Sequence, residues 1–373
     1  MGFSLKHIFH KKENAAVFIE PGGIGDYYFN IPFFKYIRQS EKFKNLKLIL
    51  IAKDNQIDFV KSNCGEYFDE IISCNYTDYL ESKDYKKYLL KKIHKYNVQI
   101  LVNLRMIIVD TMGDCRPRRH LVKDVKAKLK IADVIKLKEN KKFEKKFYKN
   151  YNQFIFTGNV GIKFELERKQ YFFEQLLGVK IDDVRFENKI EKFIKSDKKN
   201  IAISMEALLD NRMASTDTWG KILKYILSSK TEINIIFIGS SDIKQQVKKV
   251  ILEYGDEHCI DITGKTSVSM LPFILSKCDL LLSVETGTVH VAHSVGCKTI
   301  CISNGSFYKR FHPYADDIVK YIYSPKFIEK YQQSDDQFKY EAWCGGQKWD
   351  LDSVNIEDII SEINKIVGGS NGR

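Results

Sequence analysis

An acid, a hydroxyl and a glycine stand side by side at Glu285, Thr286 and Gly287. They follow an apolar run at residues 280–284, predicted as a strand, and they open a predicted helix at residues 286–295. The first N–H groups of a helix have no partner within it, and the helix dipole concentrates positive charge there. This turn is therefore suited to holding a phosphate group.

A second turn, Pro-Gly-Gly-Ile-Gly-Asp, follows the first predicted strand. Its glycines, Gly22, Gly23 and Gly25, permit positive backbone angles and a close approach of a ligand to the main chain. A dinucleotide fingerprint would need another glycine where the chain has Tyr28, so a nicotinamide or flavin site is disfavoured. Asp26 lies at the start of the next predicted helix, either as its N-cap or as a general base projecting into a cleft.

Both turns belong to a chain in which predicted strands and helices alternate. Strands are predicted at residues 15–20, 46–52, 68–73, 98–104, 201–204, 233–239, 260–262, 280–284 and 298–303. Helices are predicted at residues 26–39, 79–96, 163–177, 218–227, 242–254, 267–276, 286–295 and 356–367. Residues 116–150 are rich in lysine and are predicted as surface helices and loops. The alternation is typical of parallel sheets covered by helices.

The same alternation predicts the domain organisation. We expect an N-terminal Rossmann-like domain over residues 1–180, a linker over 181–198, a C-terminal Rossmann-like domain over 199–350, and a helix and tail over 351–373. In open α/β sheets, ligands bind at the carboxyl ends of the strands, which is where both special turns fall. The predicted fold class is therefore α/β, with two parallel sheets facing each other across a cleft.

The composition predicts a globular protein of the cytoplasm. The chain has 373 residues, of which 44% are hydrophobic, enough to bury a sizeable core in two domains. No run approaches ~18 consecutive apolar residues, so we expect no transmembrane helix. The eight cysteines form no Cys-x-x-Cys pair, which favours small buried thiols in a reducing cytosol. His290 and His293 have no carboxylate or cysteine motif beside them, so a metal site is disfavoured.

Positive charge is concentrated in one part of the chain. The formal net charge is +12, and residues 116–149 hold fourteen Lys or Arg against four acidic residues. This block favours an anionic partner, with a solvated basic face as the alternative. Nucleic acid is disfavoured because no aromatic side chains interleave with the charges as in recognition modules. We call Arg116, Arg118, Arg119, Lys123 and Lys126 the basic patch.

Gly25-Asp26, followed by Asn-Ile-Pro at residues 30–32, resembles the opening Gly-Asp motif of family 9 glycosyltransferases, the heptosyltransferases of lipopolysaccharide core assembly. Residues 283–292 resemble the family signature Ser-x-Asp-Thr-Gly-x-x-His. Residues 211–215, before a Trp-bearing helix, resemble its Lys-x-Trp-Pro stretch, and Gly-Lys-Thr-Ser at 264–267 resembles the loop before the penultimate donor-domain helix. The matches occur in the family's order over most of the chain.

The resemblance implies a GT-B architecture and a metal-independent, inverting transfer of heptose from ADP-heptose to a lipopolysaccharide core-type acceptor, without a cofactor. It implies that Asp26 is the general base on the acceptor hydroxyl. In the donor site, it implies that Arg212 contacts the diphosphate and that Thr286 and Gly287 bind phosphate. It further implies that Glu285 binds the sugar hydroxyls, that His290 lines the same pocket, and that Thr266 lies near the base or ribose. The basic patch would meet acceptor phosphates or the inner membrane leaflet, with the enzyme peripheral to the membrane.

The chain departs from the family pattern at three positions. Glu285 replaces the usual Asp and reaches one methylene further, Glu20 stands in place of a Lys, and Met213 replaces Trp. Two alternatives to this activity are open. The first is the same fold acting on another nucleotide sugar, with a capsule, glycan or protein acceptor. The second is a non-catalytic nucleotide-sugar binder.

Overall fold

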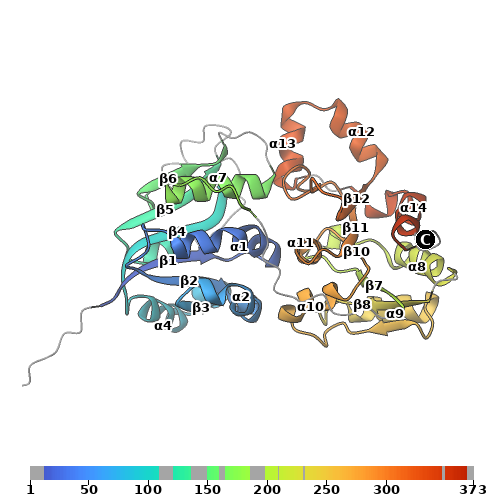
Figure 1. Ribbon diagram of the computed structural model, residues 1–373, viewed down its shortest axis with the longest axis horizontal. Coiled ribbons are helices and arrows are strands. Elements are labelled where there is room, and N and C mark those ends of the chain that lie inside the picture. The colour runs from blue at the N-terminus through green and yellow to red at the C-terminus, as the bar shows by residue number, and fades with distance from the viewer. Residues whose placement is uncertain are drawn as a thin grey trace, which may run out of the picture. The chain divides into compact units, whose positions relative to one another are not determined.

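The computed structural model describes residues 12–108, 121–135, 149–158, 164–184, 198–208, 210–229, 232–346 and 349–367. Within these ranges the chain forms two six-stranded sheets (Figure 1). The chain divides into two compact units, each with one sheet. Residues Ile24–Pro32 belong with the second unit although they lie early in the sequence.

The first sheet has the strand order β3-β2-β1-β4-β5-β6, and all neighbouring strands are parallel. Its strands are β1 Asn14–Glu20, β2 Lys47–Lys53, β3 Glu70–Cys74, β4 Asn97–Ile108, β5 Leu129–Ile135 and β6 Gln153–Phe156. The helices in this part of the sequence are α1 Ile24–Gln39, α2 Ile57–Cys64, α3 Tyr76–Glu81, α4 Lys83–Ile93 and α7 Glu165–Leu177. Val17 and Ile19 of β1 share a core with Leu89 and Ile93 of α4, because a central parallel strand is covered on both faces.

The strands predicted in the first half are confirmed, with small shifts at their ends. Two predictions there were wrong. Residues 79–96 form part of two helices, which separate at Ser82, whose side chain accepts the N–H of Tyr85 and caps α4. Residues 116–150 include β5, because Ile131 to Ile135 are buried and the ammonium of Lys130 donates to the backbone oxygen of Val122 at 2.7 Å. The strand was not predicted because many lysines surround it in the sequence.

The second sheet has the order β12-β11-β10-β7-β8-β9 and is also parallel throughout. Its strands are β7 Lys199–Ser204, β8 Ile233–Phe237, β9 Cys259–Asp261, β10 Leu280–Val284, β11 Lys298–Ser303 and β12 Val319–Tyr323. The helices that follow these strands are α8 Thr216–Leu227, α9 Lys244–Tyr254, α10 Leu271–Ser276, α11 Gly287–Ser294, α12 Pro325–Gln333, α13 Asp336–Cys344 and α14 Ile356–Val367. The predictions for β10, β11 and α14 are confirmed to the residue, whereas β12, α12 and α13 were not predicted.

One face of the second sheet is covered by α8, α9 and α14. Trp219 of α8, Val247 of α9 and Ile359 of α14 share a buried core with strand residues such as Ile203 and Leu282. These side chains recur on one stripe of each helix, so burying the stripe against the sheet stabilises helix and sheet together. The sheet thus holds its strand ends in fixed positions.

Both sheets reverse their strand order at an internal point, between β1 and β4 in the first and between β7 and β10 in the second. Such switch points are where open α/β sheets bind ligands, beyond the carboxyl ends of the strands. In the second unit, β7 and β10 are neighbours and β11 lies beside β10. Residues that directly follow these three strands are therefore expected to meet.

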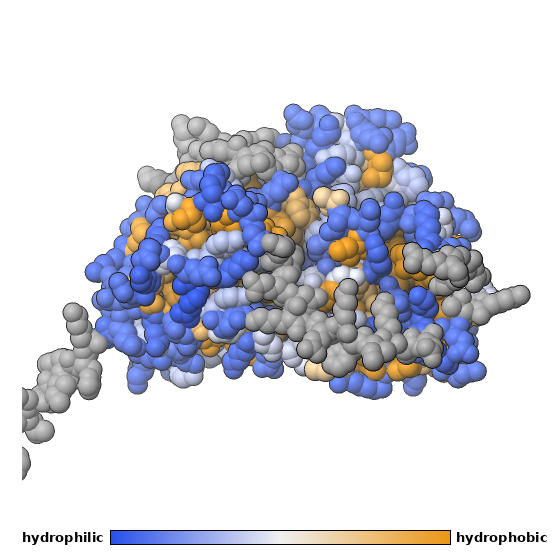
Figure 2. Space-filling view, in the orientation of Figure 1, coloured by the Kyte–Doolittle hydropathy of each residue, from blue (hydrophilic) through white to orange (hydrophobic). Residues whose placement is uncertain are grey.

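The surface seen in Figure 2 is mainly hydrophilic, with small apolar areas between charged residues. Inside the ranges that the structure describes, no helix combines the length and the apolar character that a bilayer-spanning segment needs.

Candidate active site

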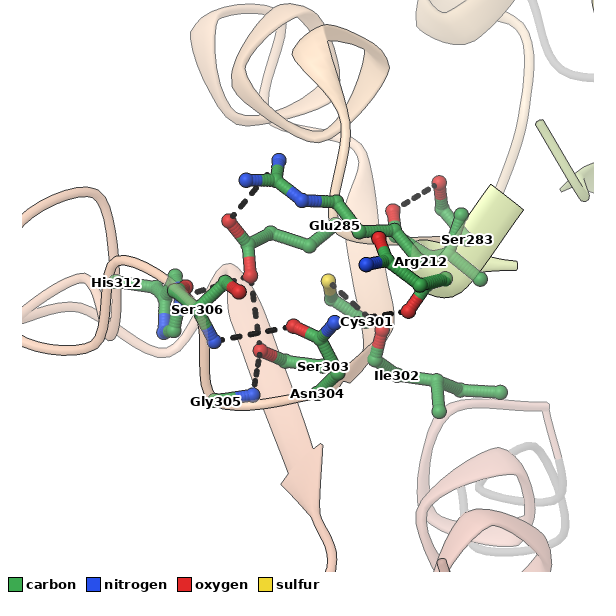
Figure 3. Close-up of polar contacts among 12 residues, drawn as sticks. Arg212, Ser283, Glu285, Cys301, Ile302, Ser303, Asn304, Gly305, Ser306 and His312 are labelled. Carbon is green, nitrogen blue, oxygen red and sulfur yellow. Dashed lines mark hydrogen bonds and ion pairs between the residues drawn. The ribbon is translucent and has the colours of Figure 1, made fainter. Parts of the chain in front are cut away.

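Glu285 lies at the centre of a polar cluster at the carboxyl end of β10 (Figure 3). Its side chain is buried, with 7% of the residue exposed. Oxygen Oε2 accepts a hydrogen bond from the hydroxyl of Ser303 at 3.0 Å and lies 3.0 Å from Nε2 of His312. Oxygen Oε1 lies 3.9 Å from Nη1 of Arg212. The two oxygens of the carboxylate therefore have different surroundings.

Arg212 ends a 3₁₀ turn, Asp210–Arg212, in the segment that follows β7. Its guanidinium lies over the ring of Phe307, 4.6 Å from the centroid, and this contact fixes the direction of the side chain. The amide nitrogen of Asn304 donates to the backbone oxygen of Asn211 at 3.0 Å and so fixes the turn itself. A planar cation held this way suits an oxyanion that can accept two hydrogen bonds, such as a diphosphate.

Thr286 and Gly287 form the start of α11, as predicted. Thr286 is the N-cap residue, with extended angles φ −150° and ψ 171°, and its side chain makes no capping hydrogen bond. The hydroxyl of Thr286 and the first N–H groups of the helix directly follow Glu285 in the chain. A helix start of this kind stabilises a bound anion.

Gly25 packs against α11 inside the second unit. A methyl group on Gly287 would lie 3.2 Å from the backbone nitrogen of Gly25, and one on Gly25 would lie 2.8 Å from Cδ2 of His290. The two backbones can approach only because both residues lack a side chain. None of Gly22, Gly23 and Gly25 adopts a positive φ. Close packing requires glycine at Gly25, whereas a methyl group on Gly23 would meet no atom within 4 Å.

Asp26 follows Gly25 and is half-buried. The N-cap alternative for Asp26 is wrong, because α1 begins at Ile24 and Asp26 lies within its first turn. Phe29, one turn further along α1, contacts the rings of His290 at 4.8 Å and Phe311 at 5.4 Å between centroids. Asp26 and Thr286 are thus next to a pair of glycines whose backbones touch, and the carboxylate and the helix start belong to one neighbourhood.

His290 is a buried neutral side chain of this neighbourhood. Its Nδ1 lies 2.7 Å from the hydroxyl of Tyr314. Burial lowers the pKa of His290 to about 3, and the nearby His293 and His312 act in the same direction. His290 therefore carries no charge near neutral pH, and its ring fills the space beside Gly25.

The predicted position Thr266 lies away from Glu285 in the second sheet. Thr266 is exposed in the loop after β9, and β9 is separated from β10 by two strands, a lateral distance of about 14 Å. No hydrogen bond joins Thr266 to Arg212 or Glu285 among the residues described. Glu20, at the end of β1, is fully buried and accepts the N–H of Gly22 at 2.9 Å.

The basic patch is only partly described. Arg116, Arg118 and Arg119 lie outside the described residues. Lys123 and Lys126 are exposed and precede β5, which places them toward the amino ends of the strands in the first sheet. Because parallel sheets bind small ligands at the opposite edge, these two lysines are better suited to a surface contact than to a phosphate within a site.

The sequence did not single out the loop after β11, which completes the cluster around Glu285. Ser303 ends β11, and His312 is fully buried nine residues later. Between them, Phe307 has φ 58° and Lys309 has φ 66°, an uncommon backbone conformation for side chains of this size. No motif marks these residues. The one signal in the sequence was the predicted end of a strand at Ser303, because the residues that follow it must lie at the same edge of the sheet as Glu285.

Comparison with known proteins relates the chain to one family. Residues 165–337 match the family model described as glycosyltransferase family 9 (heptosyltransferase). Over 195 residues the chain is 24% identical to the lipopolysaccharide core heptosyltransferase OpsX of Haemophilus influenzae, a match that covers 51% of this chain and 54% of that protein. The chain thus spans about half the length of this curated relative.

Solved structures of low identity share the fold over nearly the whole chain. The glycosyl transferase family 9 protein of Veillonella parvula has a TM-score of 0.71 at 14% identity and covers 97% of this chain and 99% of its own. The E. coli heptosyltransferase WaaC with ADP has a TM-score of 0.67 at 10% identity and covers 94% and 99%. The chain therefore has the GT-B fold, and its residues 165–337 are similar to family 9 glycosyltransferases (heptosyltransferases).

Proposed function

We propose that this protein is a metal-independent, inverting glycosyltransferase that moves heptose from ADP-heptose to a lipopolysaccharide core-type acceptor. The observation that carries the proposal is the cluster at the ends of β7, β10 and β11, where a guanidinium, a carboxylate and a helix start converge. The family of residues 165–337 and the names of the relatives support the same activity. No cofactor is needed for the chemistry.

In the proposed reaction, Asp26 removes the proton of an acceptor hydroxyl. The resulting oxygen attacks the anomeric carbon of the donor sugar as the bond to the diphosphate breaks on the opposite face, and the configuration inverts. A positioned base contributes about 10²–10⁴-fold to such a step. Arg212 and the start of α11 stabilise the charge that develops on the leaving diphosphate.

The remaining residues recognise the donor in this proposal. Glu285 accepts hydrogen bonds from sugar hydroxyls through Oε1, and His290 forms part of the pocket wall. Thr286 and Gly287 bind phosphate through the helix start. Thr266 contacts the ribose or base, which agrees with its position at the far edge of the sheet from β10.

One observation favours a second candidate function on the same fold. Glu285 has one methylene more than the aspartate of the family signature, and buried donors hold its carboxylate in place. This difference supports a donor sugar other than heptose, with a capsule, glycan or protein acceptor.

Titration calorimetry with a panel of nucleotide sugars tests the donor. We expect ADP-heptose to bind wild-type protein more tightly than ADP alone, because Glu285 adds contacts to sugar hydroxyls, and more tightly than uridine or guanosine diphosphate sugars. The matched comparison is Glu285→Gln, which should lose the advantage of ADP-heptose over ADP. Tighter binding of a uridine or guanosine diphosphate sugar would contradict the heptose assignment and favour the second candidate function.

We also propose that the basic patch brings the protein to an anionic membrane surface on the cytoplasmic side, close to a glycolipid acceptor. Cations near such a surface contribute about 1 kcal/mol each, so replacing Lys123 and Lys126 with Gln should weaken binding to phosphatidylglycerol vesicles roughly 30-fold at low salt. Sedimentation with vesicles measures this. Replacing the exposed Lys248 and Lys249 of α9 with Gln is the matched control. Equal losses in both double variants would contradict a specific patch.

A further inference from the structure

His312 is buried completely and contacts three polar groups. Its Nε2 lies 2.8 Å from the backbone oxygen of Ser306 and 3.0 Å from Oε2 of Glu285, and its Nδ1 lies 2.8 Å from the hydroxyl of Tyr323. A backbone carbonyl and an ionised carboxylate only accept hydrogen bonds, so the atom that faces both must carry a proton. The single Nε2–H of His312 is therefore shared between the backbone oxygen of Ser306 and Oε2 of Glu285, whether Nδ1 is protonated or not.

The two oxygens of the Glu285 carboxylate differ in their partners: Oε2 is hydrogen-bonded to the protein, whereas Oε1 has only a longer contact with Arg212. Oε2 takes both donors, the hydroxyl of Ser303 and the Nε2–H of His312. The oxygen of Ser303 also accepts the N–H of Gly305 at 3.2 Å, which helps direct the hydroxyl hydrogen to Glu285. Oε1 faces Arg212 at 3.9 Å, which is an ion pair beyond hydrogen-bond distance. Oε1 is therefore the oxygen that a sugar hydroxyl can reach.

The loop from 303 to 312 holds this arrangement together. Asn304 accepts the N–H of Ser306 at 3.0 Å and donates to the turn that carries Arg212, so one loop sets the positions of both charged groups. Arg310 is buried and donates to the carboxylate of Glu165 at 3.0 Å, which fixes the end of the loop next to His312. The positive φ angles at Phe307 and Lys309 are sustained by these contacts, and strained backbone of this kind is concentrated at functional sites.

We propose that His312 is a positioning residue that determines donor-sugar specificity through Glu285. It holds the longer side chain of glutamate in one orientation, with Oε1 directed at the donor sugar and beside Arg212. A glutamate has one more rotatable bond than an aspartate, so without the second donor its carboxylate would sample several orientations. This inference rests on the proposed function, because it assumes that Glu285 contacts the sugar of a nucleotide-sugar donor.

Calorimetry on two His312 variants tests the proposal, with ADP-heptose and ADP as ligands, or with the donor that the panel selects and its nucleoside diphosphate. His312→Leu removes the N–H, and we expect the affinity for the nucleotide sugar to fall about tenfold or more while ADP binding is unchanged. His312→Gln carries an amide N–H that can reach the same carboxylate, and we expect it to restore most of the loss. Equal losses for both ligands in His312→Leu would overturn the proposal.

A double-mutant cycle adds an independent measurement. In Glu285→Asp the shorter carboxylate no longer reaches His312, so adding His312→Leu should cause no further loss of nucleotide-sugar affinity. Additive losses would overturn the proposal. If His312→Leu does not fold, Ser303→Ala removes the other donor and should give the same selective loss for the sugar. A wild-type protein that binds the donor without transferring the sugar would contradict the proposed function and leave this binding cycle intact.

Discussion

Asp26→Asn should abolish sugar transfer and leave donor binding unchanged. The amide has the size of the carboxylate but cannot accept a proton, so we expect kcat to fall by about 10²–10⁴-fold. The donor should bind as before, because in our proposal its contacts come from Arg212, Glu285 and the start of α11. Single-turnover transfer assays and calorimetry on the same preparation separate the two effects.

Asp58→Asn provides the matched control for this experiment. Asp58 is an exposed carboxylate that, like Asp26, lies in the first turn of a helix. Its replacement should leave kcat unchanged, which excludes a general effect of removing a charge near a helix start. Transfer that persists in Asp26→Asn would show that another group is the base. A wild-type protein that binds donors and transfers no sugar would favour the non-catalytic binder.

The parts of the fold that could be predicted are those specified by local sequence. The ends of β10 and β11 matched because each is a short apolar run between polar or glycine residues, which is a local signal. In β5, the lysines around a buried strand have the opposite local preference, and pairing with β4 overrides it. The identity of a strand in such a segment depends on its neighbours in the sheet and not on its own composition.

The candidate site shows the same division between local and distant contacts. Glu285, Thr286 and Gly287 are consecutive, so the sequence could place them together at a strand-to-helix turn. His312 contacts Glu285 across 27 positions, and the loop that brings it there passes through φ angles that Phe307 and Lys309 seldom adopt. Gly25 and His290 are separated by most of the chain, so the spacing of motifs could not predict their contact either. The residues that we propose to recognise phosphate were therefore predictable, whereas those that we propose to orient the recognising groups were not.

Arg212→Met should lower kcat/KM by about 10²–10³-fold, because the developing charge on the diphosphate would lose its cation. Methionine keeps much of the length of the side chain and can still cover Phe307, so the loss reports the charge more than the packing. Steady-state kinetics with calorimetry on ADP measures the effect. Arg212→Lys should recover part of the rate, since it keeps the charge and loses the planar pair of donors.

Arg212→Met and His312→Leu should differ in the ligands whose affinity they lower. Arg212 acts on the diphosphate, so Arg212→Met should weaken ADP and ADP-heptose alike, whereas His312→Leu should weaken only the ligand that carries the sugar. Arg38→Met is the surface control, because Arg38 is paired with Asp69 at 3.1 Å in the first unit and should affect neither ligand. If Arg212→Met leaves ADP affinity unchanged, the cation does not contact the diphosphate, and the ion pair with Glu285 at 3.9 Å would instead place Arg212 at the sugar.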